Sequence, residues 1–215
     1  MPSFYNAERS YIVSTSLKVM YTTLTKQPAL RPLPDDLRAA LRLWLTPGVR
    51  RYLLVRDPYD RLVSFHADKL RAAVPKGEAA SWQHCQQILF PHLGLSGREE
   101  PAAIAERLRA VSFEAFVALL PRVFRADPHL WPQSWSRSFR VRGVKLPARV
   151  DRVLKIEEDV EALTRELGLD VSIRDNATEH DPAERYFDAP TYQVANQVYR
   201  DDFVGFSYPM RGAAG

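Results

Sequence analysis

Short apolar runs alternate along the chain with longer stretches whose apolar residues follow a helical spacing. The apolar runs cover residues 10–13, 51–55 and 152–157, and each is followed by polar or charged residues. Short runs of this kind are typical of strands that are buried on both faces of a sheet. We therefore predict three strands at these positions, the first of them buried.

Helical spacing follows each predicted strand and fills most of the remaining chain. After the first strand, Leu17, Met20, Tyr21 and Leu24 fall at i, i+3, i+4 and i+7, which predicts a helix that begins at Thr15. Further helices are predicted over 37–45, 57–73, 81–90, 101–110, 112–124 and 159–169, and from Pro190 onward.

This alternation predicts an α/β fold in which a parallel β-sheet is flanked by helices. The length of 215 residues suits one domain over 1–215 better than two small ones. Ligands of such sheets bind at the carboxyl ends of the strands. The step from Val13 to Ser14 and the step from Val55 to Arg56 are therefore the two candidate binding positions.

Charge and cysteine content narrow the kinds of ligand. Lys and Arg number 30 against 26 acidic residues, so the net charge is +4 at pH 7. This mild excess suits a small anionic ligand and does not by itself favour nucleic acid. The lone cysteine, Cys85, excludes an internal disulfide and a multi-cysteine metal site, and the histidines lack a metal-ligand spacing. We expect neither a bound metal nor a nucleic-acid partner.

No segment has the pattern of a membrane span or an export signal. The apolar segment FVALLPRVF is short and is interrupted by Pro121 and Arg122. The first residues, MPSFYNAERSYIV, lack the basic start and apolar core of a signal peptide. We expect a cytoplasmic protein without a transmembrane segment.

Three hydroxyl side chains, Ser14, Thr15 and Ser16, mark the first junction. Placed at a helix start, they favour either of two interpretations: an anion-binding cradle or an ordinary helix cap. The junction lacks the glycine-rich G-x-x-x-x-G-K-[ST] turn of nucleoside triphosphatases, since no glycine precedes Gly48.

The second junction reads VRDPYDRLVS. Arg56 leaves a strand end and can bind a phosphate through two hydrogen bonds, and Pro58 favours a helix start at Asp57. Ser64 falls on the same helical stripe as Asp57 and Arg61. A phosphate monoester site and a capped surface helix with an Asp57–Arg61 pair both remain open.

The second junction also resembles a known signature. RDPYDRLVSFHADK resembles the R-D-P-x-x-R-x-x-S…K motif of carbohydrate sulfotransferases (sulfotransferase family 2), which transfer sulfuryl groups from 3′-phosphoadenylyl sulfate. Other segments look like pieces of the same family, in the family's order: STSLKVM, DPHLWPQ, VDRVLKIEEDVEALTRELGL, DNAT and VYRDDFVGFSY. The resemblance extends along most of the chain, and the shared order makes it specific.

The resemblance implies a P-loop-like sulfotransferase fold and a donor site at the two junctions. Arg56 and Ser64 would bind the 3′-phosphate of the donor. The 5′-phosphosulfate would be surrounded by Ser14, Thr15 and Ser16. An acceptor hydroxyl would attack sulfur in line, and a base would take its proton.

Several residues are candidates for the base and for donor contacts. His129, in DPHLWPQ, is our first candidate for the base, because an ordinary imidazole has a pKa of about 6.5; the alternative is a loop histidine packed beside Trp131. Glu157 ends a strand and could be a base or a support for neighbouring loops. Asn176 could hydrogen-bond the donor or the acceptor, or serve as a turn residue.

The chain departs from the family pattern at Tyr11. The family places a lysine shortly before the hydroxyls, as in P-K-x-x-x-T, and an alignment on STSLK puts Tyr11 there. A phenol is neutral at pH 7 and cannot neutralise a leaving phosphate. Three interpretations stay open: Arg9 or Lys18 supplies the charge, the loop is shortened, or activity is weak or absent.

The sequence therefore predicts an enzyme that sulfates a hydroxyl of a carbohydrate or glycolipid, with no metal. A glycolipid acceptor would bring the protein to a membrane surface. The main alternative is a catalytically impaired nucleotide-binding or scaffolding protein, for which Tyr11→Lys would restore turnover. A P-loop kinase is disfavoured, because the lysine-bearing glycine loop is missing.

Overall fold

The computed structural model describes residues 2–33, 45–73, 82–141, 144–172 and 181–212. The chain divides into two compact units. The first consists of Met1–Asp57 and Gln133–Ala177, and the second of Pro58–Pro132 and Thr178–Gly215. The expectation of one domain over 1–215 stays a prediction.

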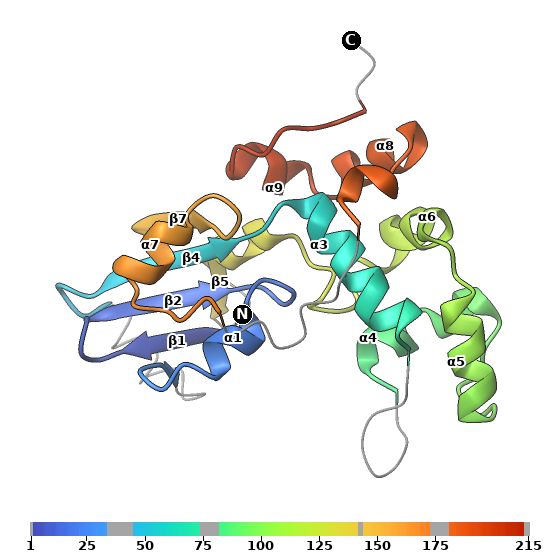
Figure 1. Cartoon of the computed structure of the whole chain (residues 1–215), viewed down its shortest axis with the longest axis horizontal. Helices are drawn as coiled ribbons and strands as arrows, with labels where there is room; N and C mark the ends of the chain where they lie inside the picture. The colour runs from blue at the N-terminus through green and yellow to red at the C-terminus, as the bar shows by residue number, and fades with distance from the viewer. Residues whose placement is uncertain (1, 34–44, 74–81, 142–143, 173–180, 213–215) are drawn as a thin grey trace. The chain divides into compact units, whose positions relative to one another are not determined.

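The first unit is built on a five-stranded mixed sheet with the order β3-β1-β2-β4-β7 (Figure 1). The three strands predicted from the sequence are confirmed as β2, β4 and β7, and they are parallel. Two further strands, β1 and β3, extend the sheet in the antiparallel sense. The strands are β1 Ser3–Asn6, β2 Tyr11–Thr15, β3 Arg31–Pro32, β4 Arg50–Val55 and β7 Arg152–Lys155.

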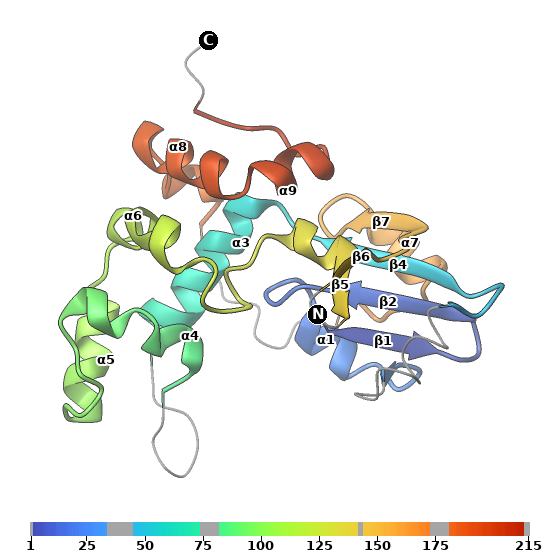
Figure 2. The same cartoon turned by 180° about the vertical axis from the view of Figure 1, so that it is seen from behind.

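Two helices cover one face of this sheet. Tyr11, Val13 and Leu54 alternate with residues of the opposite face and pack against Leu24 of α1 (Tyr21–Thr25) and Leu163 of α7 (Val160–Arg165). A hairpin of β5 (Ser138–Val141) and β6 (Val144–Pro147) lies on the other face, as Figures 1 and 2 show from opposite sides. The described residues thus confirm an α/β fold whose parallel strands are flanked by helices.

The prediction that a helix begins at Thr15 is wrong. Strand β2 runs through Thr15, and α1 begins only at Tyr21. Between them Lys18 (φ 69°) and Met20 (φ 53°) adopt left-handed backbone conformations, which a right-handed helix cannot contain. The Thr15 hydroxyl donates to the carbonyls of Ser16 and Val19 and so stabilises a turn instead of a helix start. The helix predicted over 37–45 lies outside the described residues except for its last position.

The second unit is helical. A continuous helical segment of its described residues is formed by α3 (Pro58–Phe65), which continues as a π-helical turn, η1 (His66–Arg71). Helices α4 and α5 both contact this turn. The other helices are α4 His84–Gln87, η2 Phe90–Leu93, α5 Pro101–Arg109, α6 Phe113–Val123, η4 Ala183–Arg185, α8 Ala189–Val198 and α9 Arg200–Gly205. The helices predicted within 57–73, 81–90, 101–110 and 112–124 and after Pro190 are confirmed, although several are shorter than expected. None of the described helices is long and apolar enough to cross a membrane.

Tyr11 generates a test of the first unit's core. Its hydroxyl donates to the Leu167 carbonyl at 2.7 Å, and its ring contacts Tyr52 edge-on. Tyr11→Phe should lower the free energy of unfolding by about 1–3 kcal/mol, because it leaves that carbonyl buried without its donor. Tyr11→Lys should destabilise the protein further instead of restoring turnover, because it buries an ammonium group. Urea unfolding measures both effects. Tyr5→Phe on β1 is the matched control, and an equal loss there would contradict the assignment.

Candidate functional site

The turn between β2 and α1 contains the first set of predicted ligand groups. Ser14 Oγ lies 2.8 Å from Ser3 Oγ, and the Thr15 hydroxyl is engaged by backbone carbonyls. Within the described part of the chain, Ser16 Oγ is buried and has no hydrogen-bond partner. A buried hydroxyl without a partner costs free energy, so this position favours an external ligand group. Of the three predicted hydroxyls, Ser16 is therefore the one the structure leaves available.

Lys18 lies in the same turn, and its backbone contacts Arg56 of the second junction. Arg56 leaves β4 at the carboxyl end of the parallel strands, and its Nη1 donates to the Lys18 carbonyl at 3.4 Å. The structure thereby brings together the two regions that the sequence selected separately. Ser16, Lys18 and Arg56 together offer a hydroxyl, an ammonium and a guanidinium, which suit an anionic ligand.

Two polar side chains, the buried Gln133 and the exposed Glu157, hold the backbone at this junction. The amide of Gln133 both accepts from the Arg56 N–H at 2.9 Å and donates to the Arg56 carbonyl at 2.7 Å. Glu157 accepts from the Asp57 N–H at 2.9 Å, in agreement with the interpretation of Glu157 as a loop support. Gln133 escaped the sequence argument. Its signal is its place as the last residue of DPHLWPQ, the segment that also contains His129.

Arg9 lies away from this turn. It precedes β2, at the amino end of a strand that spans about 13 Å. Its Nη1 donates to the carbonyls of Arg165 and Glu166 at 2.9 and 3.1 Å, so it caps the end of α7. Gly168 (φ 65°) makes room for this arrangement, because a Cβ atom there would lie 2.8 Å from the Arg9 guanidinium carbon. The structure therefore does not bring Arg9 to the predicted hydroxyls.

The same geometry changes the interpretation of Tyr11. Tyr11 begins β2 in the core, and burial raises the pKa of its phenol. The strand–turn–helix transition that a K-x-x-x-T loop needs comes later, at Lys18 to Thr22, where Thr22 lies in α1. Lys18 thus lies in the turn, whereas Tyr11 lies in the core of the sheet.

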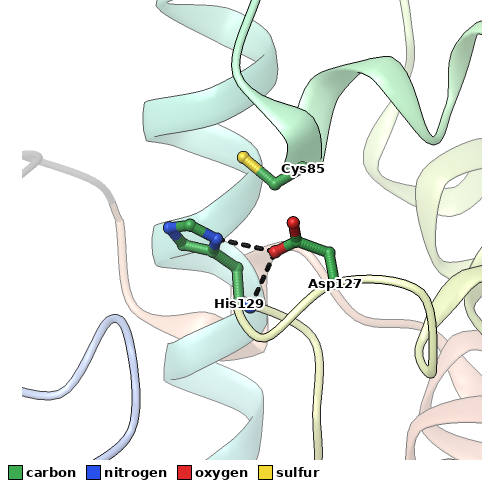
Figure 3. A group of neighbouring side chains, drawn as sticks. All are labelled: Cys85, Asp127 and His129. Atoms are coloured by element: carbon green, nitrogen blue, oxygen red, sulfur yellow. Dashed lines mark hydrogen bonds and ion pairs between the residues drawn. The ribbon is translucent and has the colours of Figure 1, made fainter. Parts of the chain in front are cut away.

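In the second unit, Asp127 joins two histidines (Figure 3 draws Asp127 and His129). Oδ1 of Asp127 accepts from both the backbone N–H and Nδ1 of His129, at 2.8 and 2.7 Å. Oδ2 lies 2.7 Å from Nδ1 of His84. Because an ionised carboxylate only accepts, the proton of a neutral His129 ring sits on Nδ1 and its Nε2 can accept one. This is the tautomer that a general base needs.

The carboxylate of Asp127 is ionised at neutral pH. Burial alone would raise its pKa, but hydrogen bonds from His129 and His84 outweigh burial and lower the pKa to about 2. The loop is held from a second side by Arg61, whose Nη2 donates to the His129 carbonyl at 2.8 Å. The Tyr199 hydroxyl donates to the neighbouring carbonyl of Leu130 at 2.8 Å. His129 is thus fixed in position by backbone and side-chain contacts.

Two further predicted site residues are Ser64 and Asn176. Ser64 lies on α3 in the second unit and is buried. Asn176 lies outside the described residues. The roles assigned to both stay predictions.

A comparison with protein families identifies the class of protein. A family model described as Sulfotransferase family matches residues 41–209, which is most of the chain. The chain therefore belongs to the sulfotransferase family, in agreement with the α/β fold and with the resemblance found in the sequence. Searches of curated proteins and of solved structures give no significant match.

The lowered pKa of Asp127 predicts a pH dependence of stability. Because the pKa falls from 3.8 to about 2 on folding, the stabilisation is fully present above pH 4 and is lost as the pH falls toward 2. Asp127→Asn should cost roughly 2 kcal/mol at pH 7 and flatten the loss of stability between pH 4 and 2. Urea unfolding across this pH range measures it. Asp181→Asn, which removes an exposed partner of Arg185, is the control. Equal effects of the two substitutions would contradict a special role for Asp127.

Proposed function

We propose that the protein transfers a sulfuryl group from 3′-phosphoadenylyl sulfate to a hydroxyl of a carbohydrate or glycolipid. The observation that carries the proposal is the contact of Arg56 with the Lys18 turn in the first unit. It joins Arg56 to the turn that carries Ser16 and Lys18, and these cationic and hydroxyl groups suit a ligand with phosphate at two positions. Members of the sulfotransferase family, to which the chain belongs, generally use this donor.

The first unit fits the donor in its charges and in its unsatisfied groups. Ser16 Oγ would donate to the 5′-phosphosulfate, since it is buried and has no partner among the described residues. Lys18 would place an ammonium beside the same group. Arg56 would bind the 3′-phosphate, with its backbone held on both sides by the Gln133 amide. The prediction that Ser64 and Asn176 also contact the donor is kept.

The donor, when bound, supplies a sulfuryl group that is open to in-line attack by a hydroxyl, with the 3′,5′-bisphosphate as leaving group. Lys18 would stabilise the negative charge that develops on the leaving oxygen, the role that the sequence alone could not assign to Tyr11. His129 would accept the proton of the acceptor hydroxyl at Nε2, because Asp127 keeps the ring proton on Nδ1.

The alternative of a catalytically impaired binding protein loses its main argument. That alternative rested on Tyr11 in the place of a lysine, and Tyr11 belongs to the core of the sheet. Lys18 lies in the turn where a lysine is needed. We therefore favour an active enzyme. The acceptor class is proposed from the resemblance to carbohydrate sulfotransferases.

The donor site is tested by calorimetric titration with adenosine 3′,5′-bisphosphate. Arg56→Ala should weaken binding by about 2–5 kcal/mol, because it removes a charged contact to a phosphate. Arg31→Ala, which removes an exposed arginine of β3 in the same unit, is the matched control and should bind as the wild type does. Wild-type affinity in Arg56→Ala would refute the assignment.

Lys18→Met should act mainly on the transfer step. Loss of one group that stabilises developing charge costs about 100- to 1,000-fold in kcat, and the bisphosphate affinity should fall much less. A radiolabelled sulfate-transfer assay measures the rate. Lys26→Met, which changes the lysine that follows α1, serves as the control. A rate loss of the same size in both variants would show that Lys18 has no particular role.

His129→Ala should slow transfer by about 100- to 10,000-fold while the bisphosphate affinity stays near that of the wild type. The physical reason is that the variant lacks the proton acceptor but keeps the donor-binding groups of the first unit. Transfer kinetics and calorimetry on the same protein separate the two effects. Unchanged turnover would remove His129 from the mechanism.

A further inference from the structure

Three side chains with metal-binding atoms meet in the second unit: Cys85, Asp127 and His129. The Cys85 sulfur, a carboxylate oxygen of Asp127 and a ring nitrogen of His129 all lie within 4.8 Å of one another. Cys85 comes from α4, and the other two come from the loop after α6 (Figure 3). No spacing rule could reveal this group, because Cys85 lies 42 residues before Asp127 in the sequence.

The chemistry of the three groups matches Zn²⁺. A thiolate, an imidazole and a carboxylate are all zinc ligands, and soft sulfur disfavours Mg²⁺ and Ca²⁺. Zinc bonds of about 2.0–2.3 Å in tetrahedral geometry place ligand atoms roughly 3.3–3.8 Å apart. Side-chain rotations that move the three ligand atoms by about 1 Å would bring them to these separations. The hydrogen bond between Asp127 and His129 would open, because each atom would bind the metal instead.

The surroundings of the cluster support a site with one open position. His84 Nδ1 lies 2.7 Å from Oδ2 of Asp127, and Oδ1 is the oxygen that meets Nδ1 of His129. Outer contacts of this kind orient ligating carboxylates in metal sites. The His84 side chain is 66% exposed and that of His129 is 23% exposed, so the cluster reaches solvent although Cys85 is buried. Three protein ligands and one water complete a tetrahedral shell.

We propose that this cluster binds Zn²⁺ and that the bound metal switches off His129 as a proton acceptor. In the metal-free protein the neutral ring carries its proton on Nδ1 and accepts through Nε2. To bind Zn²⁺ through Nδ1, the ring releases the Nδ1 proton to solvent and takes up a proton on Nε2, which becomes a donor. The Cys85 thiol releases its proton to solvent and binds as thiolate, so the two negative ligands balance the charge of the ion. The inhibitory part of the proposal rests on the proposed function of His129, whereas the metal site does not.

The metal site is tested by titrating the whole protein with Co²⁺, a spectroscopic substitute for Zn²⁺. Thiolate-to-cobalt charge-transfer absorption should appear, saturate at one metal per chain and vanish when Zn²⁺ is added. Cys85→Ser should abolish this absorption, and His129→Ala should weaken metal binding at least tenfold. His92→Ala, which changes an exposed histidine of the same unit, is the control and should bind as the wild type does. Absence of the absorption in the folded wild-type protein would overturn the site.

The switch is tested by ¹⁵N NMR of the histidine rings, which reports the tautomer directly and requires no turnover. Without metal, His129 should show an unprotonated Nε2, and one equivalent of Zn²⁺ should move the proton to Nε2. The resonances are assigned with His129→Ala. An Nε2 that stays unprotonated in the zinc-bound protein would overturn the switch.

The consequence for catalysis is measured as zinc sensitivity of the transfer rate. Zn²⁺ should inhibit the wild type and His92→Ala, and Cys85→Ser should lose at least tenfold in sensitivity, each relative to its own metal-free rate. Full activity of the zinc-bound wild type would overturn the inhibitory role. A metal-free protein that binds the bisphosphate without transferring sulfate would contradict the proposed function alone, since the cobalt and NMR results decide the metal site and the tautomer without it.

Discussion

The reciprocal pair of hydrogen bonds between the Gln133 amide and the backbone of Arg56 organises the first unit around its candidate site. Parallel strands end at a common edge, but a strand end alone does not fix the chain that follows it. Gln133 satisfies both backbone groups of Arg56, and Glu157 satisfies the next N–H. Three segments that are distant in sequence are thereby tied at the point where β4 ends. A buried backbone group without such partners would cost about 1–3 kcal/mol, so the arrangement is strongly determined.

In the second unit, hydrogen bonds with side chains likewise fix a segment of backbone, but this segment is a loop instead of a strand end. Asp127, Arg61 and Tyr199 each contact the segment that carries His129. The Asp127 carboxylate does more than position the loop, because it selects the tautomer of the imidazole. A single carboxylate therefore links stability at low pH, the availability of a ring nitrogen and the grouping of three metal-binding atoms.

The local pattern of apolar and polar residues was sufficient to predict the parallel strands and most of the helices. Strands and amphipathic helices each produce a recognisable pattern of apolar positions in the sequence. The prediction failed between Thr15 and Tyr21, where left-handed residues without glycine interrupt an apparent helical spacing. The alignment based on that spacing placed Tyr11, a core residue, at the lysine of the family pattern. The partners of Arg56 and His129 could not be predicted from the sequence, because Gln133 and Asp127 act through contacts that depend on tertiary structure. Arg56 and His129 themselves could be identified as candidate site residues from the sequence, because they lie in segments that resemble known motifs.

The left-handed conformations of Lys18 and Met20 have an energetic consequence for the β2–α1 turn. Non-glycine residues in this region cost of order 1–3 kcal/mol each, and a flexible glycine loop would avoid this cost. A glycine loop, however, would lose much more conformational entropy each time it closed around a ligand. Here the ordering cost has been met during folding, so the turn is preorganised. The protein thus exchanges some of its folding stability for a turn that needs little rearrangement when an anion arrives.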